Sequence, residues 1–299
     1  MRTQVAFAAT VALSLLACEP AAEAPPSAVA TDTVVTPDGV GIVYDVRGAG
    51  EPTLVFIHCW ACDRTFWKGQ LDTLATTHRV VALDLAGHGE SGTARSAWSL
   101  AGLAADVQTV ADTLGLDRMV LVGHSLGAPV SLLAAARMPG RVEGVICVDA
   151  LQNADFVFPR ELSEQMMAAF HADFAGQLAR MVDMMFPPAA DTAIKRWVLD
   201  KGMGADTGAV LAIIADYPSY DEKAALSAAG VPVRCINAVP SGPMSLASNV
   251  EANRKYADFD AVLLDGVGHY LHLERPAEFN ALLRQTLDGL AAARDTAHD

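Results

Sequence analysis

Basic residues are scarce in this chain. It has 21 lysine and arginine residues against 35 aspartate and glutamate residues, which gives a formal net charge of −14 over 299 residues. No stretch gathers lysine and arginine into a cluster. Because proteins hold nucleic acids through such clusters, the charge balance argues against a nucleic-acid partner.

Other signals are missing as well. The sequence has no internal repeat, no phosphate-binding loop, no dinucleotide fingerprint and no closely spaced set of metal ligands, so it implies no cofactor. What it does have is 52% hydrophobic and 19% charged residues. That composition is typical of a globular protein with a sizeable core, and the length suits one α/β domain with an insertion.

The first residues resemble a targeting segment. Met1 and Arg2 precede an apolar run from Val5 to Leu16, which is shorter than the roughly 20 residues that span a bilayer. The run ends in Leu15-Leu16-Ala17-Cys18, which resembles the bacterial lipobox. We therefore predict a signal peptide over residues 1–17 and lipidation of Cys18.

Residues 18–32 lack apolar periodicity and are rich in Ala, Pro, Glu, Ser and Thr, as in a flexible tether. A tether directly after the cysteine favours a lipoprotein. The expected location is a bacterial membrane, with the protein facing the periplasm. The alternative is an ordinary secretory signal and a soluble secreted or periplasmic protein.

Four cysteines remain besides Cys18. Cys147 and Cys235 lie in apolar, strand-like runs and are interpreted as core residues. Cys59 and Cys62 have redox-motif spacing, but we interpret them as a stray pair rather than a thioredoxin-type site. In an oxidising compartment, a local disulfide between these two cysteines is an alternative.

Short apolar runs alternate with helix-like stretches along most of the chain. This rhythm predicts a parallel sheet covered by helices on both faces, preceded by a β-hairpin. The expected hairpin strands are 33–36 and 41–47, the apolar strands are 53–58, 80–85, 119–123, 142–148, 231–236 and 261–264, and the helices are 66–76, 126–138 and 276–292.

The strand rhythm stops between Asp149 and Val231. There, Met and Phe residues recur at three- and four-residue intervals, which is helical amphipathic spacing. We predict a helical cap over residues 151–230, inserted into a core formed by residues 33–150 and 231–299. The apolar residues would pack the cap on the sheet, and part of them could line a hydrophobic substrate pocket.

The strongest chemical signal is Gly123-His124-Ser125-Leu126-Gly127. It lies between an expected strand and an expected helix. In that context Gly-x-Ser-x-Gly forms a sharp turn, with small neighbours that let the backbone pass. The turn would point the hydroxyl of Ser125 at the helix N-terminus, where positive partial charge stabilises an oxyanion. Ser125 is the predicted nucleophile.

Three further segments resemble motifs of one family and occur in the family's order. From about Thr33 to Leu290 the chain resembles the α/β hydrolases, in their capped branch of esterases and related hydrolases. The resemblance implies an α/β fold, with a mostly parallel central sheet, helices on both faces and an inserted helical cap. The segments are Phe56–Trp60, similar to His-Gly-x; Asp84–Ser91, similar to Asp-x-x-Gly-x-Gly-x-Ser; and Gly266–Pro276, similar to the catalytic-histidine segment.

The resemblance also implies roles. His269 follows the last strand and is the expected base, since a serine hydroxyl needs one. The backbone N–H groups of Leu126 and Trp60 would form the oxyanion hole. The chain departs from the family at Cys59, where glycine is usual, so the loop there is either strained or differently shaped. The remaining matched histidines would organise loops or pack: His58, His88, His124 and His272.

The acid is harder to place. The family most often has it after the penultimate strand, but Ile236–Pro243 contains no carboxylate. Another branch has it one strand earlier, which matches Asp149 and keeps the order of nucleophile, acid and base. Asp149 is the predicted acid. The alternatives are that Asp149 is a helix cap or pocket residue and that another carboxylate, such as Asp265, meets the ring of His269.

Serine at position 125 argues against dehalogenases and epoxide hydrolases, which have aspartate there. We expect a serine hydrolase, a carboxylesterase that acts on small or medium hydrophobic esters through an acyl-enzyme. Its partners would be an ester-like small molecule and, through the lipid, a membrane. Lactone or C–C bond hydrolysis, acyl transfer or perhydrolysis, and a non-catalytic binding lipoprotein on the same scaffold stay open.

Overall fold

A computed structural model describes residues 29–240 and 246–298, with side chains as far as residue 294. The predicted signal peptide, Cys18 and most of the tether lie outside the described residues, as do residues 241–245. No helix within the described ranges is both long enough and apolar enough to cross a membrane.

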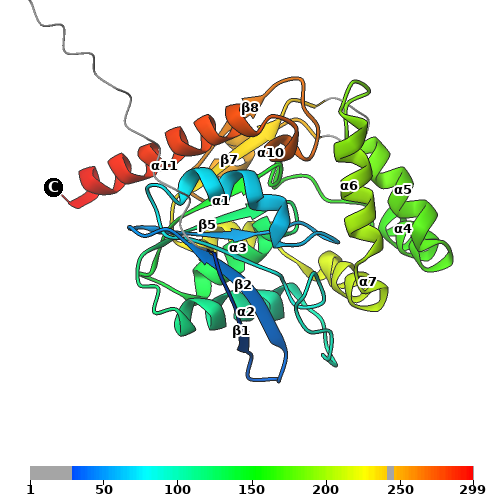
Figure 1. Ribbon diagram of the computed structural model, residues 1–299. Coiled ribbons are helices and arrows are strands. Elements are labelled where there is room, and N and C mark those ends of the chain that lie inside the picture. The colour runs from blue at the N-terminus through cyan, green and yellow to red at the C-terminus, as the bar shows by residue number, and fades with distance from the viewer. Residues whose placement is uncertain (1–28, 241–245, 299) are drawn as a thin grey trace, which may run out of the picture.

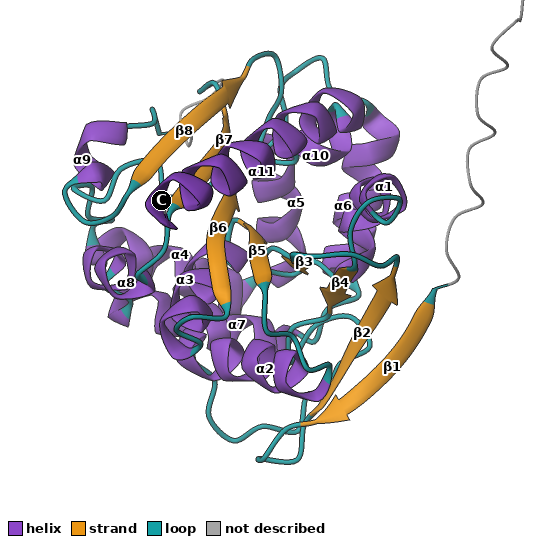
Figure 2. Cartoon of the chain, turned by 90° about the vertical axis from the view of Figure 1, so that its left-hand side faces the viewer, coloured by secondary structure: helices purple, strands orange, loops and turns teal. Residues whose placement is uncertain are grey.

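One eight-stranded sheet forms the centre of the fold, in the order β1-β2-β4-β3-β5-β6-β7-β8. Figure 2 shows the strands fanning out in that order. The first two strands form the expected antiparallel hairpin, and β3 to β8 run parallel to one another. The strands are β1 (Ala30–Val35), β2 (Gly41–Arg47), β3 (Thr53–Ile57), β4 (Val80–Leu83), β5 (Met119–His124), β6 (Val142–Val148), β7 (Val233–Ala238) and β8 (Phe259–Leu264).

The hairpin fixes where the described chain begins. Ala30, the first residue of β1, pairs with Val46 of β2, and Val46 pairs with Val81 near the start of β4. The amino-terminal strand therefore starts at the edge of the sheet opposite the carboxyl ends of the parallel strands.

The three helices expected outside the cap are present and differ from the expectation mainly at their ends, whereas the helices over 100–113, 250–254 and 271–274 were not predicted. The stretch at 66–76 begins as a 3₁₀ helix, and the last helix runs six residues past Ala292. The helices are η1 (Arg64–Trp67), α1 (Lys68–Leu74), α2 (Leu100–Thr113), α3 (Gly127–Arg137), α4 (Arg160–Ala172), α5 (Phe174–Met184), α6 (Thr192–Met203), α7 (Thr207–Asp216), η2 (Tyr217–Ser219), α8 (Glu222–Ala229), α9 (Val250–Arg254), α10 (Leu271–Glu274) and α11 (Pro276–His298).

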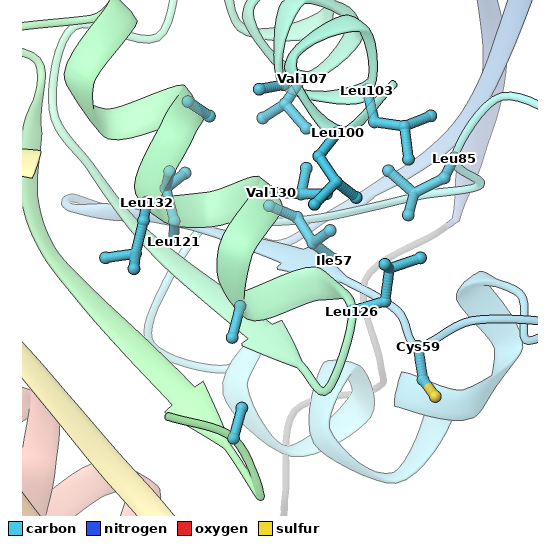
Figure 3. Close-up of a cluster of buried hydrophobic side chains, with 14 of the residues drawn as sticks. Ile57, Cys59, Leu85, Leu100, Leu103, Val107, Leu121, Leu126, Val130 and Leu132 are labelled. Carbon is cyan, nitrogen blue, oxygen red and sulfur yellow. The ribbon is translucent and has the colours of Figure 1, made fainter. Parts of the chain in front are cut away.

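Each face of the sheet has its own hydrophobic core, because successive strand residues point to opposite faces. In β3, Val55 and Ile57 pack with residues of α2 and α3, whereas Leu54 and Phe56 pack with residues of α1 and α11. Figure 1 shows the two helix layers, and Figure 3 shows the α2–α3 side. A continuous apolar strand is what burial on both faces requires.

The inserted helices α4 to α7 stand off one end of the sheet in Figure 1. The last helix of the predicted cap, α8, is different: it packs against α3, and its Leu226 is buried in the core of that face. We therefore place the end of the insertion before α8 rather than at residue 230. Of the Met and Phe residues expected to pack inward, Met184 is an exception and is 51% exposed.

Candidate active site

Ser125 lies in the turn between β5 and α3. Its φ of 52° is in the left-handed region, which residues other than glycine rarely adopt. Its side chain is half-buried. Both flanking glycines are required by close packing. A Cβ at Gly123 would lie 2.3 Å from the carbonyl oxygen of Gly127, and a Cβ at Gly127 would lie 2.3 Å from that of Ile57. The sequence thus builds a strained turn at the helix N-terminus.

His269 is held on the loop after β8 by its own backbone. Its N–H donates to the carbonyl of Met185 at 2.8 Å, and its carbonyl accepts from Nε2 of His124 at 2.9 Å. The preceding N–H, that of Gly268, donates to Glu274 at 2.9 Å. Met185 caps α5, so the inserted helices help position this loop. The sequence carried no signal for that contact.

Asp149 follows β6 and reaches the ring of His269. Its Oδ2 is 2.6 Å from Nδ1 of His269, and both side chains are about 15% exposed. Its Oδ1 accepts from the N–H of Ala238 at 2.9 Å. The end of β7 thus holds in place a carboxylate that the neighbouring strand supplies. This is the contact that the strand-end position of Asp149 predicts, whereas the donor at Ala238 could not be foreseen.

The rival position contains no acid in its described part. Asn237 is buried, and its Oδ1 accepts from the N–H of Ala150 at 3.1 Å. Asp265, the other rival, is exposed, and its Oδ1 accepts from the N–H of its neighbour Gly266. Among the described carboxylates, only that of Asp149 bonds to the ring of His269.

The electrostatics of His269 follow from these neighbours. Burial lowers its pKa, but the bond to Asp149 and the nearby Cys59 raise it, and the balance is a raised pKa. Because Nδ1 faces Asp149, Nε2 is the atom left to accept a proton. Nε2 is buried and has no hydrogen-bond partner among the described residues. The described residues therefore show no hydrogen bond between Ser125 Oγ and this nitrogen.

The expected oxyanion donors also lack acceptors. Within the part of the chain that the structure describes, neither the N–H of Leu126 nor that of Trp60 donates a hydrogen bond. Leu126 directly precedes α3, and Trp60 follows β3 by three residues. Unpaired N–H groups at the carboxyl ends of neighbouring strands are available to a developing negative charge.

The turn at residues 59–62 shows how the chain accommodates Cys59, where the family usually has glycine. Residues 59–62 form a β-turn closed by the N–H of Cys62, which donates to the carbonyl of Cys59 at 3.3 Å. In this turn the left-handed φ falls on Ala61, at 54°, and not on Cys59. The side chain of Cys59 is buried beside Leu126 (Figure 3). The pKa of the Cys59 thiol lies well below its ordinary value, mainly because of the hydrogen bond with Cys62. Burial raises this pKa, whereas His269 and Ser125 lower it further.

The other histidines make structural contacts. His58 accepts at Nε2 from the N–H of Leu85 at 2.9 Å, and its Nδ1–H donates to the carbonyl of Cys59 at 2.7 Å. Burial lowers its pKa to about 4. His88 bonds to the carbonyl of Ala86, and the ring of His272 packs at a tilt against Trp67, with ring centroids 4.6 Å apart. These contacts are those of the loop-organising and packing roles that the resemblance implies.

Apolar rings from the inserted helices cover the turn at Trp60. Its ring meets those of Phe170 and Phe174 with centroids 5.4 and 6.2 Å apart, and its Nε1–H donates to the carbonyl of Val210 at 2.7 Å. The inserted helices therefore place apolar aromatic rings against the turn that carries one of the expected oxyanion donors.

Three potential metal ligands also meet here, which their spacing in the sequence did not reveal. One donor atom from each of Cys59, His124 and His269 lies within 4.8 Å of the others. They come from the ends of three different strands, so only the folded sheet brings them together.

Comparisons with known proteins find relatives of the same fold. The sequence profile of a family described as alpha/beta hydrolase fold matches residues 52–182. The dihydrolipoyllysine-residue acetyltransferase component of the acetoin cleaving system of Cupriavidus necator is 28% identical over 267 residues, which are 84% of this chain and 68% of that protein.

Two solved structures are similar over most of the chain. Est816, described as an N-acyl homoserine lactone degrading enzyme, has a TM-score of 0.73 at 25% identity, over 84% of this chain and 98% of its own. A thermophilic esterase from Thermogutta terrifontis also has a TM-score of 0.73, at 21% identity over 88% and 99% of the two chains, which is a likeness of fold. The matched profile and these neighbours show that the chain has the α/β-hydrolase fold.

Proposed function

We propose that the chain is a serine hydrolase, most specifically a carboxylesterase for small or medium hydrophobic esters. The observation that carries this proposal is the 2.6 Å contact between Asp149 Oδ2 and His269 Nδ1, on the loop beside the Ser125 turn. In the neutral ring that acts as the base, this contact keeps the proton on Nδ1. Nε2 then keeps its lone pair for the proton of the Ser125 hydroxyl.

The reaction would proceed through an acyl-enzyme. As Ser125 Oγ attacks the ester carbonyl, its proton moves to His269 Nε2, and Asp149 stabilises the imidazolium that forms. The carbonyl oxygen becomes an oxyanion that the N–H groups of Leu126 and Trp60 would receive. The imidazolium then protonates the leaving alcohol. Water, deprotonated by the same ring, hydrolyses the acyl-enzyme.

Two features support a hydrophobic acyl or alcohol group. The aromatic rings around Trp60 offer an apolar surface, and the net charge of −14 disfavours anionic substrates. Lactone hydrolysis is the second candidate, because a lactone is a cyclic ester and Est816, a lactone-degrading enzyme, is a structural neighbour.

The test uses the purified full-length protein in detergent, with p-nitrophenyl esters of graded chain length and N-acyl lactones as substrates. A fluorophosphonate probe should label Ser125, and Ser125→Ala should lose both the label and several orders of magnitude in turnover. Near-native turnover in Ser125→Ala would refute the serine mechanism. A wild-type protein that takes no label would instead favour a non-catalytic binding lipoprotein.

We also propose that the protein is exported and anchored through a lipid on Cys18. The support is the sequence Leu15-Leu16-Ala17-Cys18 after a short apolar run and before a tether of polar and small residues. The ester-like substrate would then be met outside the cytoplasm.

A further inference from the structure

We propose that Cys59, His124 and His269 form a zinc(II) site whose occupation switches the hydrolase off. The three side chains follow or end β3, β5 and β8, whose carboxyl ends lie at one edge of the sheet. Their donor atoms lie within 4.8 Å of one another. The claim of inhibition rests on the proposed function, whereas the claim of binding does not.

The donor set suits zinc. A thiolate and two imidazoles are ligands that Zn²⁺ takes in tetrahedral sites, at about 2.3 Å for sulfur and about 2.0 Å for nitrogen. Tetrahedral geometry then places such donors about 3.5 Å apart. The donor atoms now lie within 4.8 Å of one another, so they would have to close by at most about 1 Å, which small side-chain rotations can supply. A fourth position is left for water or another small ligand.

Both imidazoles have lone pairs that nothing in the described chain uses. Nε2 of His124 donates to the carbonyl of His269, so in that tautomer Nδ1 carries the ring's lone pair. Nδ1 is buried and has no hydrogen-bond partner. Nε2 of His269 is likewise buried without a partner, while its Nδ1 is held by Asp149. A carboxylate on the distal nitrogen is the arrangement that orients metal-binding histidines.

Burial strengthens the argument. His124 is fully buried and Cys59 is 3% exposed. Polar atoms without partners are costly in such surroundings, so a metal ion that satisfies them gains affinity. On binding, a Zn–S bond replaces the S–H bond of Cys59, and the proton goes to solvent. The metal also takes the lone pair of His269 Nε2, which the proposed mechanism needs for the proton of Ser125.

The binding test uses full-length Ser125→Ala in detergent, reduced with a phosphine, and Co²⁺ as a spectroscopic stand-in for Zn²⁺. We expect one equivalent of Co²⁺ to give a sulfur-to-cobalt charge-transfer band and the strong visible bands of a tetrahedral site. Zn²⁺ should displace it. Adding Cys59→Ser should remove the charge-transfer band, whereas adding Cys62→Ser, a thiol of the same turn, should retain it.

The inhibition test uses the protein with Ser125 intact. Zn²⁺ should inhibit ester hydrolysis, and Cys59→Ser or Cys59→Gly should raise the inhibitory concentration by at least about tenfold, since even outer-shell changes cost about 10–100-fold in metal affinity. Each variant is compared with its own metal-free rate. The same charge-transfer band in the Cys59→Ser protein, or its loss with Cys62→Ser, would overturn the site. Because the cobalt spectrum needs no turnover, a failure of the esterase proposal leaves this test intact.

Discussion

The carbonyl of Met185, where α5 ends, accepts a 2.8 Å hydrogen bond from the backbone N–H of His269. This contact joins the inserted helices to the loop of the proposed base. It depends on Gly268, where a Cβ would lie 2.2 Å from that same carbonyl oxygen and 3.0 Å from Cα of Phe186. Both obstacles are backbone atoms, which cannot swing aside as a side chain can.

We therefore expect Gly268→Ala to push the helices away from the loop. It should cost about 1–3 kcal/mol in the free energy of unfolding, as overpacking does, and it should lower kcat through misplacement of His269. Urea unfolding and ester kinetics measure the two effects. Gly289→Ala on α11 is the matched control, because nothing lies within 4 Å of its Cβ. Equal behaviour of the two variants would contradict the proposed role of the contact.

Neutralising Asp149 should act on turnover rather than on folding. In Asp149→Asn the Oδ1 atom can still accept from Ala238, but the charge that stabilises an imidazolium is gone. We expect kcat to fall by ~10³–10⁴, the scale known for a neutralised triad aspartate, with an unchanged circular dichroism spectrum. Asp265→Asn, on an exposed rival acid, should keep its activity. A large loss in Asp265→Asn and none in Asp149→Asn would reverse the assignment.

Glu222 makes stability depend on pH. Its Oε1 is buried and has no hydrogen-bond partner among the residues that the structure describes, and burial raises its pKa from 4.5 to about 7. The folded state then holds a proton that the unfolded state has lost, so stability falls as pH rises between about 4.5 and 7 and stays lower above that. Glu222→Gln should stabilise the protein by about 1–2 kcal/mol at pH 8 and by little at about pH 4.5.

Urea unfolding at both pH values measures this difference. Glu161→Gln on α4 is the control, since Glu161 is exposed. A gain from Glu222→Gln that is the same at both pH values would show that packing, not charge burial, is responsible.

The proposed anchor is tested by fractionation. Expressed in a bacterium, the protein should sediment with membranes and incorporate labelled fatty acid, and Cys18→Ser should abolish the label. Wild-type protein that stays unlabelled and soluble after export would mean that the cysteine is incidental.

Much of the sheet could be predicted because burial on both faces requires continuous apolar strands. The run at 142–148 is β6 to the residue, and the strand-end position of Asp149 placed it opposite His269. Helix α8 was misplaced, because its apolar face looks the same whether it packs on other inserted helices or on α3. Periodicity reports that a face is buried and not what buries it.

The proposed metal site could not be predicted, for a different reason. Cys59, His124 and His269 are far apart in the chain, and no local spacing links them. Sheet order decides which strand ends are neighbours, and β3 and β5 are adjacent although β4 lies between them in the sequence. The loop at Cys59 was expected to be either strained or differently shaped, and it is differently shaped, because the left-handed φ falls on Ala61.

The starting point of β1 has a consequence for orientation. Ala30 lies at the edge of the sheet opposite the Ser125 turn, and the chain from Cys18 to Ala30 can span at most about 40 Å. A lipid on Cys18 would attach the molecule to the bilayer from the side where the parallel strands begin. The proposed catalytic end, at the carboxyl ends of these strands, would then face the aqueous phase. We expect such an enzyme to draw its esters from solution rather than from the membrane that holds it.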